Sequence, residues 1–135
     1  MKYKFLKHTA DIKFQAFGST LESAFENSAL AMANSMYSGK VLPKIKKIIK
    51  VKGKDLESLL YNFLEEILFL LDSTNFFISK IKIKINQKDN ILVAELYGDN
   101  AKNYKIGLDV KAVTYNEMFI KKIKSQWICQ VVIDV

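Results

Sequence analysis

A broad apolar stripe after Asp55 constrains the fold more than any other feature of this sequence. Large aliphatic and aromatic residues recur there at helical spacing. The stripe consists of Leu56, Leu59, Leu60, Phe63, Leu64, Ile67, Leu68 and Leu71. Asp55 is expected to cap this helix, because its carboxylate can accept hydrogen bonds from the first turn. So wide a stripe must be buried, so the chain needs other elements to cover it.

A second helix is predicted earlier in the chain, at Thr20–Tyr37. Ser19 and Glu22 form the spacing of a capping box at its start. Before it, the segment Ile12–Phe17 alternates between the two faces of a strand, and Gly18 predicts the turn that ends it.

The rest of the chain is predicted to be mainly strand. The expected strands are Lys46–Lys52, Phe76–Ile85, Ile91–Tyr97, Ala112–Lys121 and Trp127–Ile133. Turns at residues 87–90 and 124–126 predict antiparallel hairpins. No repeat or Pro/Ser-rich linker divides the 135 residues, so we expect a single domain over residues 1–135. Strand, helix, strand and helix followed by a run of strands predict an α+β fold in layers.

The net charge of +7 comes from one segment. Residues 40–54 carry seven lysines and no acid, whereas the remaining 14 lysines balance 14 acids. A local basic patch attracts phosphates or an acidic protein surface. The absence of arginine disfavours sequence-specific nucleic-acid recognition, because arginine is the usual bidentate reader of guanine and phosphate. Codon bias alone would also explain the uniform use of lysine.

No feature of the sequence indicates export or membrane insertion. The N-terminus lacks the long apolar core of a signal peptide. The longest nearly apolar run, Ile67–Leu71, is far too short to span a bilayer. The lone Cys129 cannot form an internal disulfide and is expected to pack in the core. We therefore expect a cytoplasmic protein.

The segment His8-Thr9-Ala10-Asp11 places an imidazole, a hydroxyl and a carboxylate just before a strand. It is interpreted either as a turn held by local side-chain bonds to the backbone or as part of a site. One His and one Cys rule out a zinc site of several such ligands, and no phosphate-binding glycine loop is present. A hydrolase that uses His8 and Asp11 has no second motif to support it.

The last strand supplies a second acidic position. Asp134 is followed by Val135, whose terminal carboxylate adds another negative group. If Asp11 lies near this end, three carboxylates converge, and a hard cation such as Ca²⁺ or Mg²⁺ would compensate their repulsion. The alternative is that Asp134 only solvates the end of a strand.

Several segments in order resemble the archease family. They are His8-Thr9-Ala10-Asp11, GSTLESAF at residues 18–25, KAVTY at residues 111–115, and Trp127 with the closing Val132-Ile133-Asp134-Val135. Each segment alone is weak, but their order and spacing make the combination specific. The resemblance extends from about residue 5 to the C-terminus.

The resemblance implies an accessory protein rather than an enzyme. Archeases are known as protein cofactors of the RtcB-type RNA ligase, which joins tRNA halves, and they promote ligase guanylylation and multiple turnover. A chaperone-like role is also associated with the family. The implied fold is a two-layer α+β structure, with about six strands in a mainly antiparallel sheet and two amphipathic helices packed on it. The implied metal ligands are Asp11, Asp134 and the carboxylate of Val135, with Ca²⁺ as the usual metal and Mg²⁺ or Mn²⁺ as alternatives.

Three more residues are expected to contact the ligase. His8 either orients Asp11 or touches the partner, unless it merely packs at the start of a strand. Lys111 and Tyr115 share a strand face and could contact a phosphate or a partner carboxylate, or simply lie at the surface. The family usually has His after KAVTY, whereas this chain has Asn116, which cannot titrate near neutral pH.

A stand-alone basic RNA-binding module is the alternative function. Residues 40–54 and the alternating Lys80, Lys82 and Lys84 could form a lysine ladder if their strands are neighbours. No RNP-like aromatic run or KH-type GxxG loop supports this reading, and a solvated sheet face also explains the lysines. Indirect contact with RNA through the ligase is a further expectation.

Overall fold

The computed structural model describes residues 1–135, which form two α-helices and seven strands. The helices are α1 (Leu21–Met36) and α2 (Leu56–Thr74), and a single 3-10 turn, η1 (Ala101–Asn103), follows the fifth strand. The strands are β1 (Tyr3–Leu6), β2 (Ile12–Gly18), β3 (Ile45–Lys52), β4 (Phe76–Asn86), β5 (Ile91–Asn100), β6 (Ala112–Ile123) and β7 (Gln126–Asp134). All strand pairs are antiparallel. The predicted α+β class is therefore confirmed.

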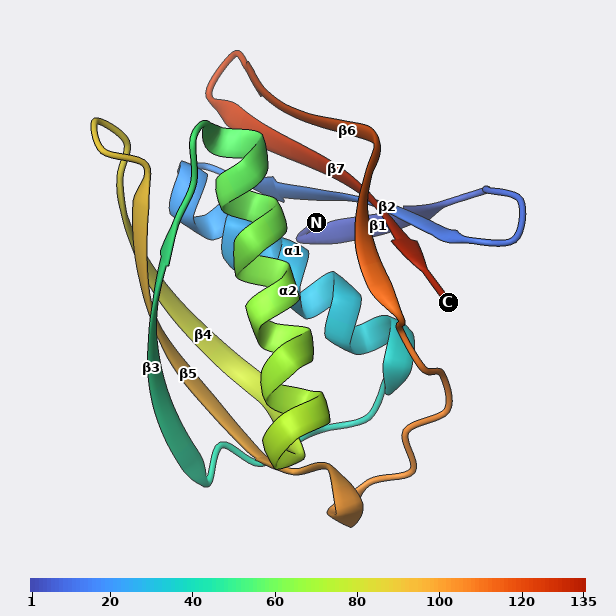
Figure 1. Cartoon of the computed structure of the whole chain (residues 1–135). Coiled ribbons are helices and arrows are strands. Elements are labelled where there is room, and N and C mark those ends of the chain that lie inside the picture. The colour runs from blue at the N-terminus through green and yellow to red at the C-terminus, as the bar shows by residue number, and fades with distance from the viewer.

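The strands form two sheets that enclose the helix pair (Figure 1). One sheet has the order β1-β2-β7-β6 and the other has the order β3-β5-β4. Helix α1 packs on β2, β7 and β4, while α2 packs on β6, β4 and β3, so each helix contacts both sheets. One continuous cluster of buried side chains joins the helices to both sheets. Neither helix is long and apolar enough to cross a membrane.

Helix α2 buries its apolar stripe as predicted. Leu59, Leu60, Phe63, Leu64, Ile67 and Leu68 are all buried. The predicted cap is also confirmed, because Asp55 Oδ1 accepts a hydrogen bond from the Ser58 N–H at 2.8 Å. The helix continues past the stripe to Thr74 and ends at Asn75, which adopts the left-handed conformation with φ of 56°.

Helix α1 begins at Leu21, one residue later than the predicted start at Thr20. The cap is Thr20 rather than Ser19, and its hydroxyl accepts a hydrogen bond from the Ser23 N–H at 3.0 Å. Ser23 rather than Glu22 completes the capping box. Leu21 is almost fully buried as the first helical residue, so packing in the core sets where the helix starts.

The structure differs from the expected single sheet of about six strands in two ways: it has a seventh strand, β1, and its strands form two sheets. Strand β1 pairs with β2 from Tyr3 opposite Ala16 to Leu6 opposite Lys13, and it forms the edge of its sheet. The remaining strands divide between two sheets because β3 and β4 both pair with β5. The predicted turns between β4 and β5 and between β6 and β7 are confirmed.

The core makes a direct prediction about stability. Phe63 of α2 is fully buried and stacks on Phe25 of α1, with ring centroids 6.4 Å apart. Phe63→Ala is expected to lower the free energy of unfolding by about 3–5 kcal/mol, because it leaves a cavity between the helices. Urea denaturation followed by circular dichroism measures this change.

The control is Phe69→Ala on the same helix, where the side chain is 61 % exposed. It should change the free energy of unfolding by no more than about 0.5 kcal/mol. Equal losses in the two variants would contradict the assignment of Phe63 to the core.

Candidate functional site

The opening and closing segments of the chain meet at one end of the four-stranded sheet. Strand β2 pairs with β7 in a register that places Ile12 opposite Ile133. Asp11 precedes Ile12 and Asp134 follows Ile133, so the two acidic residues occupy neighbouring positions on adjacent strands. The register therefore places Asp11 and Asp134 side by side at one end of the sheet, which we call the acidic strand end.

The third predicted segment lies on the other side of β7. Ala112 of β6 pairs with Asp134, and the Lys111 N–H donates a hydrogen bond to the Asp134 carbonyl at 2.8 Å. Lys111 is exposed, while Asp134 and Val135 are partly buried. The start of KAVTY is thus fixed beside the acidic strand end by the main chain.

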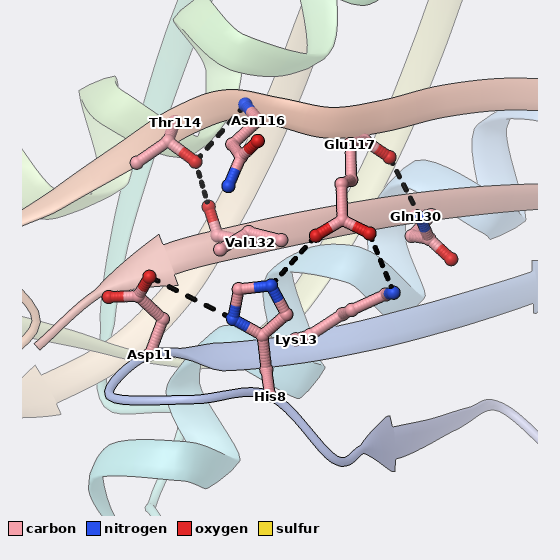
Figure 2. Close-up of polar contacts among 8 residues, drawn as sticks. All are labelled: His8, Asp11, Lys13, Thr114, Asn116, Glu117, Gln130 and Val132. Atoms are coloured by element: carbon pink, nitrogen blue, oxygen red, sulfur yellow. Dashed lines mark hydrogen bonds and ion pairs between the residues drawn. The ribbon is translucent and has the colours of Figure 1, made fainter.

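His8 lies between the two acidic side chains Asp11 and Glu117 (Figure 2). Its Nε2 is 2.7 Å from Glu117 Oε2, which is hydrogen-bonding distance. Its Nδ1 is 3.8 Å from Asp11 Oδ2, too far for a hydrogen bond, and this buried nitrogen has no other partner. Lys13 donates a hydrogen bond to the second oxygen of Glu117 at 3.0 Å. His8 and Lys13 together engage both oxygens of Glu117.

An irregular segment of β6 brings Glu117 to this position. Thr114 pairs with Val132, and the next pair joins Phe119 to Gln130, so the four residues between Thr114 and Phe119 face only one residue of β7. Glu117 has a φ of 55°, in the left-handed region that residues with a side chain adopt rarely. The Gln130 side chain holds this bulge by donating a hydrogen bond to the Glu117 carbonyl at 2.8 Å.

Sequence reasoning did not identify Glu117 as part of the site. The available signal was Asn116-Glu117, a polar pair in the middle of a predicted strand. Such an interruption is typical of a bulge, and bulges often redirect a side chain next to a functional site. The partners of Glu117 could not be found in this way, because His8 and Lys13 come from the other end of the chain.

The surroundings of Glu117 keep its carboxylate ionised. Hydrogen bonds from His8 and Lys13, followed by the positive charge of Lys13, lower the pKa of Glu117 below its ordinary value of 4.5. Each oxygen of Glu117 is hydrogen-bonded to a basic side chain. Cys129 is fully buried as predicted, and burial raises its pKa to about 12, so it offers no thiolate at neutral pH.

The donor chemistry at the acidic strand end fits a hard divalent cation. No group of three or more His, Cys, Asp or Glu side chains that could hold a metal is present. The predicted ligands include only two such side chains, Asp11 and Asp134, and take their third carboxylate from Val135. Oxygen donors of this kind suit Ca²⁺, Mg²⁺ or Mn²⁺ rather than a metal that prefers sulfur.

Tyr115 lies apart from the acidic strand end. Its ring stacks on Tyr61 of α2 at a centroid distance of 4.2 Å, and it remains 53 % exposed. It lines a surface depression together with Lys52 and Lys54. Asn116, by contrast, points its side-chain amide to the same side of β6 as Glu117 (Figure 2). The Asn116 N–H donates a hydrogen bond to Thr114 Oγ1 at 3.3 Å.

Comparison with known proteins gives consistent matches along almost the whole chain. A family model described as "Archease protein family (MTH1598/TM1083)" matches residues 3–135. "Protein archease" from Pyrobaculum neutrophilum is 42 % identical over 98 % of this chain and 95 % of its own length. "Protein archease" from Pyrococcus furiosus is 39 % identical over 99 % of both chains.

Two solved structures share the fold. The solution structure of Methanobacterium thermoautotrophicum protein 1598 has a TM-score of 0.86 and 33 % identity, covering 99 % of both chains. A Thermotoga maritima crystal structure, described as an archease and possible chaperone, has a TM-score of 0.66 and covers 98 % of this chain and 96 % of its own. At 19 % identity, the second match supports the fold alone.

The lowered pKa of Glu117 predicts how stability depends on pH. A carboxyl group whose pKa is lower in the folded state stabilises the fold above its unfolded value, here near 4.5, and loses this contribution as pH falls through the folded pKa. Glu117→Gln removes the charge but keeps the side-chain shape and the left-handed backbone. The wild type should therefore be more stable than the variant near neutral pH, and the two should converge in strongly acidic solution.

Thermal unfolding over a series of pH values measures this convergence. Asp72→Asn, which removes one exposed carboxylate near the end of α2, is the matched control and is measured over the same pH series. A difference between wild type and Glu117→Gln that persists undiminished in acid would contradict the role of the charge.

Proposed function

Because the chain belongs to the archease family, we propose that it activates an RtcB-type RNA ligase in the cytoplasm rather than catalysing a reaction itself. The observation that carries this proposal is the β2–β7 pairing, which joins the opening and closing segments of the family resemblance at one sheet end. These are also the segments that contain the acidic residues. A different register of β2 against β7 would place Asp11 and Asp134 apart.

We infer that Asp11, Asp134 and the carboxylate of Val135 hold a divalent cation, and the family resemblance favours Ca²⁺ among the metals that oxygen donors suit. When bound, such a cation supplies a compact positive charge that attracts further oxygen ligands. Ca²⁺ takes roughly six to eight oxygens, and three carboxylates leave some of these positions open. The open positions suit water or oxygen atoms on a partner surface.

The surface around the acidic strand end is suited to contact with a protein. Asp11 and His8 line a depression of about 360 Å³, together with Phe5, whose side chain is 44 % exposed. Lys111 flanks the same strand end. We propose His8 and Lys111 as ligase contacts. Tyr115 lies on the helix side of β6, so it joins the contact only if the ligase extends around that strand.

The proposed contact explains how a protein without its own chemistry can assist ligase guanylylation. The reaction needs metal ions and a closely packed nucleotide pocket, since a metal stabilises developing charge on phosphoryl oxygens. A partner that presents an acidic end could position a metal or reshape the pocket. It would then dissociate and act again, so the proposal predicts stimulation at substoichiometric amounts.

The proposal predicts the behaviour of two variants in multiple-turnover RNA ligation. The assay uses an RtcB-type ligase from the same organism, with GTP and divalent metal, and a substoichiometric amount of this protein. Asp11→Ala and Asp134→Ala should each reduce the stimulation by about tenfold or more, because each removes a proposed ligand. Both variants should fold like the wild type, since both side chains lie at the ends of strands.

Asp72→Ala is the matched control, because it removes an exposed carboxylate from α2 and not from the strand ends that carry Asp11 and Asp134. It should stimulate ligation as the wild type does. Full stimulation by Asp11→Ala or Asp134→Ala would refute the role of the acidic end, and no stimulation by the wild type would refute the ligase proposal itself.

A further inference from the structure

The outer face of the β3-β5-β4 sheet carries two rows of exposed lysines. Lys46, Lys50 and Lys52 come from β3, and Lys80, Lys82 and Lys84 come from β4. Strand β5 lies between the two rows, with Tyr97 opposite both Lys46 and Lys80. A continuous lysine ladder would need β3 and β4 to be neighbours, and they are not. They are two strand spacings apart, about 10 Å.

All six lysines project from the same side of the sheet. Each lysine lies opposite one of the alternate β5 residues 91, 93, 95 and 97, whose side chains point to one side of the sheet. The residues between the lysines of β4, Ile81 and Ile83, are buried on the helix side. The helices lie against the opposite side of this sheet (Figure 1). We call this six-lysine surface, with the outward-facing residues of β5 and Ile48, the lysine face.

The strip of β5 between the two rows combines apolar, aromatic and acidic side chains, namely Ile91, Val93, Tyr97 and Glu95. Val93 of this strip is 40 % exposed, and Ile48, within the β3 row, is 64 % exposed. The ammonium groups of Lys46 and Lys80 lie 5.8 and 5.7 Å from the centroid of the Tyr97 ring, within the range of a cation–π contact. Val93 and the Tyr97 ring therefore give this face an apolar surface beside its charges.

Of the six lysines only Lys46 forms an ion pair, although Lys50 and Lys52 share a surface depression with Glu65 and Glu66 of α2. Glu95 is the single acid on the outward side of β5, and it forms an ion pair with Lys46 at 3.7 Å. The Tyr97 hydroxyl donates a hydrogen bond to Glu95 at 3.3 Å. Glu26 of α1 lies near Lys82 at the β4 edge, where it accepts a hydrogen bond from the Ile83 N–H.

We propose that the lysine face binds single-stranded RNA. Two rows of ammonium groups can contact the phosphates of one strand, while the apolar and aromatic strip between them accepts its bases. The close spacing of the rows suits a single strand better than a duplex. Lysine without arginine predicts binding to the backbone with little sequence preference.

The chemistry of the strip favours RNA over DNA. The Glu95 carboxylate would repel a phosphate, but it can accept a hydrogen bond from a ribose 2′-hydroxyl, and the neighbouring Tyr97 hydroxyl can also bond to it. DNA has no such group to offer. The lysine face lies on the other sheet from Asp11 and Asp134, so this inference does not depend on the proposed function.

Fluorescence anisotropy with a labelled oligouridine RNA of about 20 nucleotides tests the inference on the full chain. If all six lysines engage, log affinity should fall against log salt with a slope of about −4. The variant Lys80→Gln/Lys82→Gln/Lys84→Gln should bind about tenfold or more weakly, with a slope near −2, because one row is lost.

The matched control removes the same charge from the β6–β7 hairpin of the other sheet, as Lys121→Gln/Lys122→Gln/Lys124→Gln. These three lysines are exposed. This control should change affinity by less than about twofold at a fixed salt concentration. Circular dichroism verifies that both variants are folded.

Three results would overturn the inference. The first is no binding of oligouridine at low salt, which would leave the lysine face to an acidic protein. The second is an equal loss of affinity in both triple variants, which would mean that only the net charge of the protein matters. The third is equal affinity for the matching oligodeoxyuridine, which would remove the assignment to RNA.

Discussion

The antiparallel pairing of β2 with β7 fixes both the centre of the four-stranded sheet and the position of the acidic residues. It places these two strands at the centre of their sheet and buries Cys129, Val131 and Ile133 against the helices. A slip of one residue would turn these side chains to the opposite face, so the core specifies the register strongly. The same register puts Asp11 beside Asp134. The free energy that stabilises the fold therefore also assembles the acidic strand end.

The two sheets present surfaces of opposite character around one shared core. The four-stranded sheet gathers carboxylates at its strand ends, while the three-stranded sheet exposes lysines along its whole outer face. Helix α2 allows this separation, because its wide apolar stripe packs on both sheets and leaves their outer faces free. An acidic end suits a cation and a protein partner, whereas a lysine face suits a polyanion. The two proposed roles therefore fall on separate surfaces of the molecule.

Local patterns in the sequence predicted much of this fold, but not the long-range pairings. The stripe and the Asp55 cap located α2, and the motif resemblance located Asp11 and Asp134. Strand β1 was missed because it is short and lies at a sheet edge, where Phe5 remains exposed. Glu117 was missed because its position depends on a bulge with left-handed backbone, and on partners from the far end of the chain. The division into two sheets could not be predicted either, since no local pattern indicates that β3 pairs with β5.

The proposed cation site depends on the β2–β7 register, which brings the opening and closing segments together. A titration of the isotopically labelled protein with Mn²⁺ tests this site, because the paramagnetic ion accepts the same oxygen ligands and broadens the NMR signals of nearby amides. The first signals to disappear should be those of Asp11, Ile12, Asp134 and Val135. Preferential broadening at Asp89, in the turn between β4 and β5, or uniform broadening along the chain would contradict it.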